Sequence, residues 1–405
     1  MSIQEDKKTF IDIKDDLRPA YYDDFHCLAG DCRFTCCKGW KIAFNKRDYL
    51  TLKRQKGSDD LNARMEKALR RLRNAPNGLY GEFDVSHNDG VCALQREDGL
   101  CALQAEKGHS VLPWVCRFYP RFERSMPSGY LERGLSLACE GVVALLWDHP
   151  EGLDFRSDPL PKTKWGRLTF TEGSLHAFFG PVREWCVDLL QDRRFSLPQR
   201  ILLMGVALQE LTGEGVDMAA WMLRARALQE GKGLELPDSS QTLAMFLSNN
   251  FQVLLQLKTV PDFSSVLMDM TLSLGIQPTI GTSQATIPLA PYHSAQRRFQ
   301  EQGWDYFMEN LAVSLFFQGA VPNLDSGEAL WKSYVNYCSL YSFFRFLAVM
   351  SCREGVEDCK AALTRLVVFA SRMILHANGV DTAIRDEFFK NDSATLAHMA
   401  ILLAG

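Results

Sequence analysis

Residues 27–40 read CLAGDCRFTCCKGW, and this short stretch holds four of the 12 cysteines in the 405-residue chain. Four more follow before residue 140, so the first third of the sequence carries Cys27, Cys32, Cys36, Cys37, Cys92, Cys101, Cys116 and Cys139. Thiols stay reduced in a cytosolic compartment, where clustered cysteines indicate metal ligands rather than disulfide bonds. The stretch therefore predicts a front domain that is organised by a metal centre.

The choice of metal follows from the chemistry and spacing of these thiols. Thiolates are soft ligands that select zinc or iron–sulfur clusters. Structural zinc modules usually contain CxxC pairs, whereas the intervals between the first four cysteines are four, three and zero residues. The adjacent Cys36 and Cys37 are awkward ligands for one tetrahedral ion, while a cubane cluster offers several iron corners to separate segments. The residues favour an iron–sulfur cluster, with zinc as the open alternative, and the spacing leaves undecided which thiols bind.

Two arginines accompany Cys116 in the segment CRFYPR, residues 116–121. Arg117 and Arg121 could neutralise an anionic cluster or hold a carboxylate of a bound molecule, although ordinary surface ion pairs would also explain them. We take both arginines as candidate cofactor-binding residues. The sequence identifies no catalytic residue.

The rest of the chain predicts a mainly α fold with two domains. Residues 1–150 combine short elements, turns and one clear helix at 58–74, and residues 151–170 are rich in proline and charge, as in a linker. Residues 171–405 show helical periodicity. The expected helices there are 198–213, 217–231, 239–258, 304–318, 327–351, 357–377 and 381–404. We thus expect a cysteine-rich metal-cluster domain with little β structure, followed by an all-α helical domain.

Bulk properties exclude several classes of protein. The formal net charge of −4 does not suggest a nucleic-acid partner. The N-terminal residues MSIQEDKKTFIDIKDDLRP are charged and lack the apolar segment of a secretory signal. Apolar stretches such as 341–351 are too short to span a bilayer. We expect a cytoplasmic protein without a membrane partner, and the remaining cysteines read as small buried apolar residues: Cys186, Cys338, Cys352 and Cys359.

The front motifs resemble a known family. The matching residues are Pro19, Tyr21, Phe25, Cys27, Cys32, Cys36, Cys37, Gly39 and Trp40, then Cys92, Gly99, Cys101, Leu112, Pro113, Cys116, Pro120, Arg121, Leu135, Ser136, Leu137 and Cys139. This pattern resembles the flagellin lysine-N-methylase family, whose cysteine-rich front domain is shared with a wider set of zinc- or iron-chelating proteins. The resemblance covers the first 150 residues. One departure is Glu140-Gly141, where the family tends to follow its last cysteine with Pro-Glu.

The resemblance implies an activity and its cofactors. It implies a protein-lysine N-methyltransferase that uses S-adenosylmethionine to methylate surface lysines of flagellin and depends on a [4Fe–4S] cluster. The helical domain would then position the substrate and the methyl donor. Transfer could be radical or polar, although the usual CxxxCxxC motif of radical enzymes is absent. A non-enzymatic iron–sulfur or zinc-binding carrier or interaction protein is the alternative, and the sequence does not indicate an oligomeric state.

Overall fold

The computed structural model describes residues 8–38, 42–75, 78–85, 90–161, 167–171, 175–213, 215–256, 272, 288–375 and 380–405. Its contacts divide the chain into two compact units. The helical unit comprises Met1–Asp23, Glu123–Ala138 and Val143–Gly405, and the cysteine unit comprises Asp24–Phe122 and Cys139–Val142. Residues 8–23 and 123–138 therefore group with the helices by their contacts.

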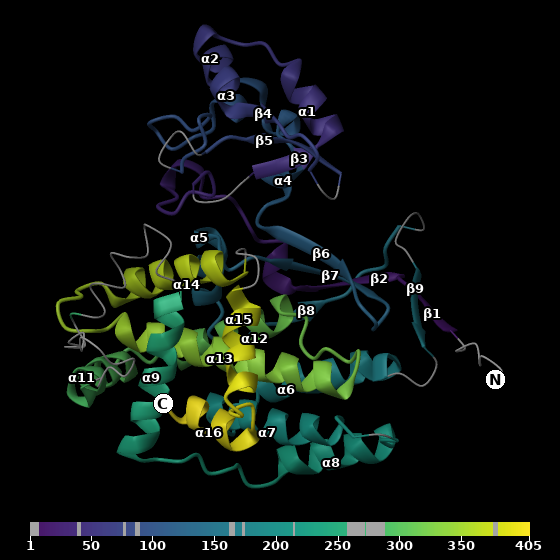
Figure 1. Ribbon diagram of the computed structural model, residues 1–405, viewed down its shortest axis with the longest axis vertical. Coiled ribbons are helices and arrows are strands. Elements are labelled where there is room, and N and C mark those ends of the chain that lie inside the picture. Colours follow the sequence, from purple (N-terminus) through teal and green to yellow (C-terminus); the bar gives the residue numbers. More distant parts are fainter. Residues whose placement is uncertain are drawn as a thin grey trace. The chain divides into compact units, whose positions relative to one another are not determined.

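The cysteine unit is built from short elements around a small apolar core (Figure 1). Its elements are β3 (Ile42–Asn45), α1 (Lys46–Lys53), α2 (Asp59–Ala68), β4 (Leu69–Arg71), β5 (Leu79–Phe83), α3 (Ala102–Lys107) and α4 (Trp114–Phe118). The three strands form an antiparallel sheet in the order β3-β5-β4. The predicted helix at 58–74 begins as expected, because the Ser58 side chain accepts a hydrogen bond from Leu61 N at 3.1 Å. It ends early because Leu69 becomes extended and pairs with Phe83.

The helical unit contains two small sheets. Strand β1 (Lys8–Asp12) pairs antiparallel with β9 (Arg167–Thr171). The second sheet has the order β6-β7-β2-β8, in which β7 (Tyr130–Leu135) and β2 (Asp15–Pro19) are parallel. Strands β6 (Arg121–Ser125) and β8 (Phe155–Arg156) form its edges. The expectation of little β structure is therefore met in part. The strands are short, but nearly all of them lie in the front part of the chain.

Helices make up the rest of the helical unit, as predicted for the back of the chain (Figure 1). They are α5 (Glu140–Trp147), α6 (Phe179–Leu190), α7 (Leu197–Glu210), α8 (Met218–Glu230), α9 (Ser240–Gln256), α11 (Leu289–Gln300), α12 (Asp305–Gln318), α13 (Gly327–Met350), α14 (Cys359–Leu375), α15 (Val380–Lys390) and α16 (Leu396–Ala404). The start of α5, up to Val142, belongs to the cysteine unit. The single helix predicted at 381–404 is two helices, because Asp392 has a φ of 51° and Thr395 caps a new helix. The proline, glycine, serine and threonine residues of 275–298 predict a loop or connector, and most of this segment lies outside the described residues.

Helix α13 is the centre of this unit. It contacts α7, α9, α11, α12, α14, α15 and α16. Its buried face is rich in aromatic residues, and Tyr334 donates a hydrogen bond to Ile201 O of α7 at 3.2 Å. Gly205 of α7 permits this approach, because a Cβ atom there would collide with the Tyr334 ring. The four back-half cysteines, Cys186, Cys338, Cys352 and Cys359, are buried, as the sequence predicted.

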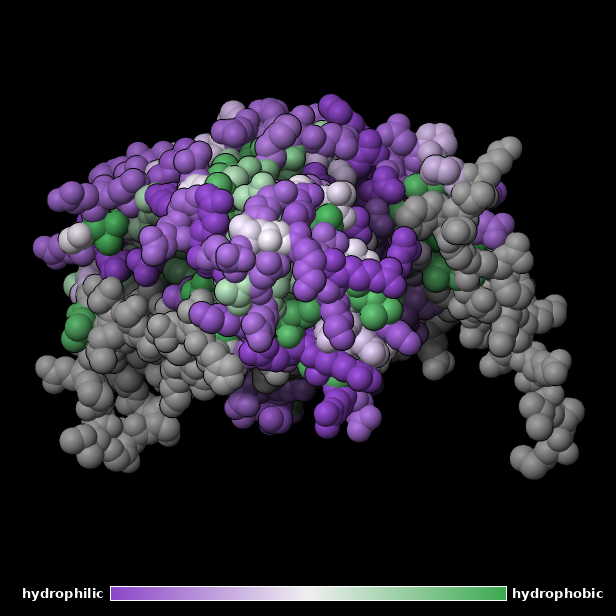
Figure 2. Space-filling model, turned by 90° about the horizontal axis from the view of Figure 1, so that it is seen from above, coloured by the Kyte–Doolittle hydropathy of each residue, from purple (hydrophilic) through white to green (hydrophobic). Residues whose placement is uncertain are grey.

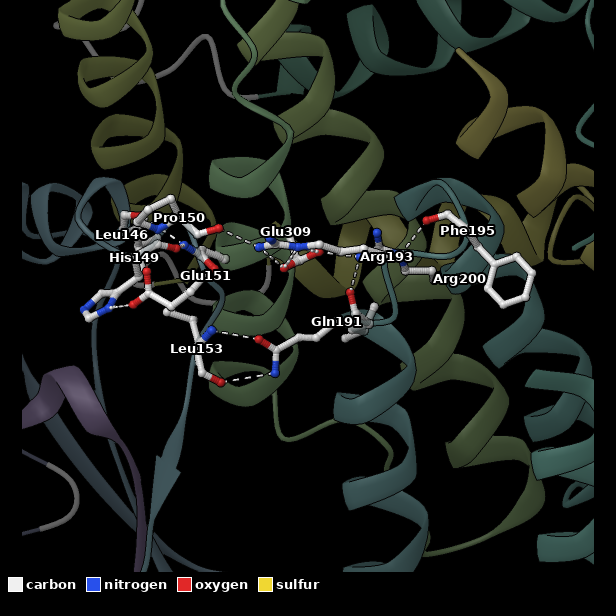
Figure 3. Close-up of polar contacts among 12 residues, drawn as sticks. Leu146, His149, Pro150, Glu151, Leu153, Gln191, Arg193, Phe195, Arg200 and Glu309 are labelled. Atoms are coloured by element: carbon white, nitrogen blue, oxygen red, sulfur yellow. Dashed lines mark hydrogen bonds and ion pairs between the residues drawn. The ribbon is translucent and has the colours of Figure 1, made fainter. Parts of the chain in front are cut away.

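A buried carboxylate ties α12 to α7 and to the turn that follows α6 (Figure 3). Glu309 of α12 is 3% exposed and accepts hydrogen bonds from Arg193 Nη2 at 2.9 Å and from Arg200 Nη1 at 2.5 Å. Gln191 extends the contact, since its side chain exchanges two hydrogen bonds with the backbone of Leu153 at 2.7 and 3.1 Å. Both charges of the Glu309–Arg200 pair are removed from water, so each depends on the other.

No helix in the described part of the chain has the combination of length and apolarity that a membrane span needs.

Replacing Glu309 by Gln should lower the free energy of unfolding of the helical unit by about 3 kcal/mol, because the buried Arg200 charge would lose its partner. Urea denaturation followed by circular dichroism would measure the change. Glu328→Gln is the matched control, because Glu328 pairs with Lys332 on the surface and its loss should leave the midpoint unchanged. Equal midpoints for Glu309→Gln and the wild type would contradict this role.

Candidate metal centre

All eight candidate thiols lie in the cysteine unit, and none of them forms a disulfide bond. The contacts around them separate two groups. We call one the core set, which comprises Cys37, Cys92, Cys101 and Cys116. We call the other the outer set, which comprises Cys27, Cys32, Cys36 and Cys139.

The core set packs on the hydrophobic core of the cysteine unit. Cys92 is 3% exposed and belongs to that core, while Cys37, Cys101 and Cys116 pack against it. Cys92 N donates a hydrogen bond to Cys37 O at 2.7 Å, which joins two distant segments. Cys101 forms a β-bridge with Gln95, just after the turn that begins at Cys92. These links bring thiols from four segments onto one face of the core.

The outer set lies outside that core. Cys27 is exposed, and its Sγ accepts a hydrogen bond from Ala29 N at 3.4 Å. Cys139 reaches this segment through its two following residues. The Cα of Gly141 lies close to the loop, because a Cβ there would be 3.2 Å from the Phe25 ring and 3.5 Å from His26 O.

Glu140 also connects Cys139 to the segment that carries Cys32 and Cys36. The sequence does not indicate Glu140 as a site residue. Its carboxylate is 4% exposed and accepts hydrogen bonds from Arg33 N at 2.7 Å, Phe34 N at 3.2 Å and Arg33 Nε at 2.8 Å. The Cys32 Sγ donates to the same carboxylate at 3.7 Å. The Arg33 side chain is 59% exposed, so its ion pair contributes little, and the backbone amides provide most of the anchoring. The only sequence signal was the acidic residue directly after the last motif cysteine.

Burial makes the thiolate form of these cysteines unfavourable. It raises the pKa of Cys92 to about 12 and that of Cys139 to about 11, and it raises the pKa of Cys32, Cys101 and Cys116 as well. The pKa of Cys36 is raised first by a hydrogen bond with Cys37 and then by burial. A positively charged centre compensates such buried thiolates, and its binding releases their protons.

The neighbours that raise these pKa values follow the two sets. Near Cys116 they are Cys37, Cys92 and Cys101, together with the carboxylate of Asp48. Near Cys139 they are Cys32 and Cys27. The Cys36 thiol lies within reach of Cys37, Cys116 and Cys139, so it stands where the two sets meet.

The two candidate arginines differ in their surroundings. Arg117 follows Cys116 in α4, and its Nε is buried without a hydrogen-bond partner among the described residues. Arg121 begins β6, and its guanidinium lies 5.2 Å from the centre of the buried Phe25 ring. Arg117 therefore brings an unused donor and a positive charge next to a core-set thiol, whereas Arg121 packs against an aromatic residue.

The chemistry of the donor set fits a thiophilic centre. Among the described residues, no group of three or more His, Cys, Asp and Glu side chains is arranged to hold one metal ion. Metal binding and the ordering of its ligands are coupled, so the thiols of a set would be drawn together as a centre forms. Eight sulfur donors in one small unit, with a buried cationic donor beside them, are the ligand chemistry that iron–sulfur clusters and zinc share.

Replacing Glu140 by Ala should destabilise the cysteine unit by about 2 kcal/mol, because two backbone amides lose their acceptor. Hydrogen–deuterium exchange should become faster across residues 27–37. Glu97→Ala is the control, since Glu97 is an exposed acidic residue in the same unit. Unchanged exchange in this segment of Glu140→Ala would show that the carboxylate does not hold it.

Comparison with known proteins finds two kinds of relative, lysine-N-methylases and a flagellar biosynthetic protein. Lysine-N-methylases of Salmonella typhimurium and Salmonella choleraesuis are each 30% identical over 138 residues, which is 33% of this chain and 33% of theirs. The chain thus spans about a third of the length of these curated relatives. The flagellar biosynthetic protein FliU of Salmonella muenchen is 30% identical over 138 residues, 33% of this chain and 78% of FliU.

No solved structure matches the chain. The family model described as the FliB lysine N-methylase C-terminal domain matches residues 183–402, which lie within the helical unit. Since this match covers more than half of the sequence, the chain belongs to the FliB lysine N-methylase family.

Proposed function

We propose that the protein is a protein-lysine N-methyltransferase that transfers methyl groups from S-adenosylmethionine to surface lysines of flagellin and depends on a [4Fe–4S] cluster. The observation that carries the proposal is the family match over residues 183–402. The relatives' names support the two halves of it, since two are called lysine-N-methylases and one a flagellar biosynthetic protein. The eight thiols of the cysteine unit support the cluster.

The transfer itself sets clear chemical demands. The acceptor lysine must be neutral to act as a nucleophile, and its free pKa is about 10.4, so the enzyme must desolvate it or offer a base. In polar transfer a bond forms between the lysine nitrogen and the methyl carbon while the bond from that carbon to the donor sulfur breaks. The lysine proton leaves to solvent or to a base. In-line positioning of nitrogen, carbon and sulfur is then the main task of the protein.

The cysteine unit would hold the cluster through its thiolates. When bound, the cluster would supply either an open iron that chelates the amino and carboxylate groups of the donor or a closed structural or redox-sensing centre. Arg117 would place its charge beside Cys116, where it offsets the negative charge of thiolates and sulfides.

The sequence does not indicate a donor site of the dinucleotide-binding type. The sequence lacks a strand that leads through a glycine-rich turn into a helix with an acidic residue about 20 positions later. We therefore assign no residue to the nucleoside of the donor, and the proposal leaves its positioning to the helical unit that matches the family.

Hydrophilic residues cover most of the face in Figure 2, and the hydrophobic residues on it form separate small areas. Exposed large apolar side chains include Trp114 in α4 and Leu223 in α8.

Anaerobically purified protein should methylate flagellin when it is incubated with S-adenosylmethionine carrying a labelled methyl group. Mass spectrometry of tryptic peptides would locate the label on lysines. Flagellin whose lysines have been chemically dimethylated beforehand is the control and should take up no label. A protein loaded with iron that transfers no methyl group, with or without a reductant, would contradict the methyltransferase proposal.

Replacing Arg117 by Gln should make the reduction potential of the cluster more negative by about 60 mV, if the lost charge changes the one-electron equilibrium tenfold. Arg117→Lys should stay near the wild type because it keeps the charge. Lys67→Gln, on the exposed side of α2, changes the net charge equally and should have no effect. Redox titration monitored by electron paramagnetic resonance would measure the potentials. An unchanged potential in Arg117→Gln would remove Arg117 from the cluster's surroundings.

A further inference from the structure

We infer that the cysteine unit carries two metal centres with four thiolates each, one in the core set and one in the outer set. Each centre would take a soft, thiophilic metal, either an iron–sulfur cluster or Zn²⁺. The inference rests on the proposed function for the presence of a cluster, and on the geometry of the thiols for the number of centres. It assigns a binding role to all eight cysteines, where one cluster would use at most four.

The core set supplies the four cysteines that a closed centre uses. Its four thiols come from four segments that pack on the same apolar core, and Cys92 is buried within it. The hydrogen bond from Cys92 N to Cys37 O and the bridge of Cys101 with Gln95 fix three of these segments to one another. Short α4 brings Cys116 to the same core. Four cysteines with an apolar surrounding are typical of a centre that stabilises a fold.

The outer set has its own scaffold, which does not use that core. Glu140 binds Arg33 N and Phe34 N, in the interval between Cys32 and Cys36, and thereby holds Cys139 next to them. Gly141 lies against the backbone at His26, which brings Cys27 into the same neighbourhood. None of the four outer-set thiols belongs to the apolar core cluster, and Cys27 is exposed. A centre here would be open to solvent on the side of Cys27.

The adjacent Cys36 and Cys37 are explained by this division. Cys37 is fixed to the core set through its carbonyl, while the Cys36 thiol shares a hydrogen bond with Cys37 and lies within reach of both Cys116 and Cys139. Two neighbouring residues cannot easily bind one tetrahedral ion, but each can serve one of two adjacent centres. The pair would then fix the distance between the centres.

Two double variants test the assignment, with metal content rather than activity as the readout. C92S/C101S removes two ligands of the core set only, and C27S/C32S removes two ligands of the outer set only. Cys359→Ser, in the helical unit, is the matched control. Each protein is purified and reconstituted without oxygen, and its iron, zinc and acid-labile sulfide are measured together with its absorbance and electron paramagnetic resonance spectra.

We expect each double variant to lose about half of the bound metal and one spectral component, while the other component stays, because each cubane needs its own set of thiolates. The control should keep both. Zinc in one set and iron in the other would appear as the selective loss of one element. If C92S/C101S fails to fold, the metal content of the wild type and of C27S/C32S still tests the number of centres. C27S/C32S is expected to fold because the outer set does not contribute to the apolar core.

The inference is overturned if the wild type binds metal for only one centre, or if folded C27S/C32S retains all of the metal or loses all of it. These outcomes say nothing against methyl transfer, which the labelling experiment tests separately. Conversely, a protein with two centres and no transferase activity would contradict the proposed function and keep this inference.

Discussion

The carboxylate of Glu140 is the contact on which the arrangement of the cysteines depends. It accepts hydrogen bonds from the Cys32–Phe34 segment, and Cys32 lies 108 positions before Glu140 in the chain. The contact therefore closes a long loop. Closing such a loop costs conformational entropy, which buried hydrogen bonds to a charged acceptor can offset. The chain leaves the cysteine unit after Phe122 and returns at Cys139, and this return gives the outer set its last thiol.

The helical unit uses the same kind of contact to fix its own elements. Glu132 of β7 is fully buried and forms an ion pair with Arg183 Nε of α6 at 2.7 Å, and Arg124 Nη2 lies 3.1 Å from the same carboxylate. Burial lowers the pKa of Arg124, and the neighbouring Glu132 opposes that change. Together with Glu309, such pairs specify which helix or strand lies beside which, because a misplaced element would leave a buried charge without a partner.

The two units carry different parts of the proposed enzyme. The family match lies within the helical unit, whereas the ligand chemistry lies in the cysteine unit. Methyl transfer from a sulfonium donor does not itself require iron. The role of the cluster would therefore be to bind the donor, to sense redox conditions or to stabilise the fold. Two centres would allow two of these roles at once: a closed core centre for stability and an open outer centre for a ligand.

The sequence by itself determined the eight thiols, the predominance of helix and the burial of the back-half cysteines. It could do so because ligand chemistry and helical periodicity are local properties. It did not determine the break between α15 and α16, the early end of α2 or the role of Glu140. Those depend on partners far along the chain, such as the pairing of Leu69 with Phe83. Only the tertiary structure divided the thiols into a core set and an outer set, because that division depends on which of them pack against a core assembled from distant segments.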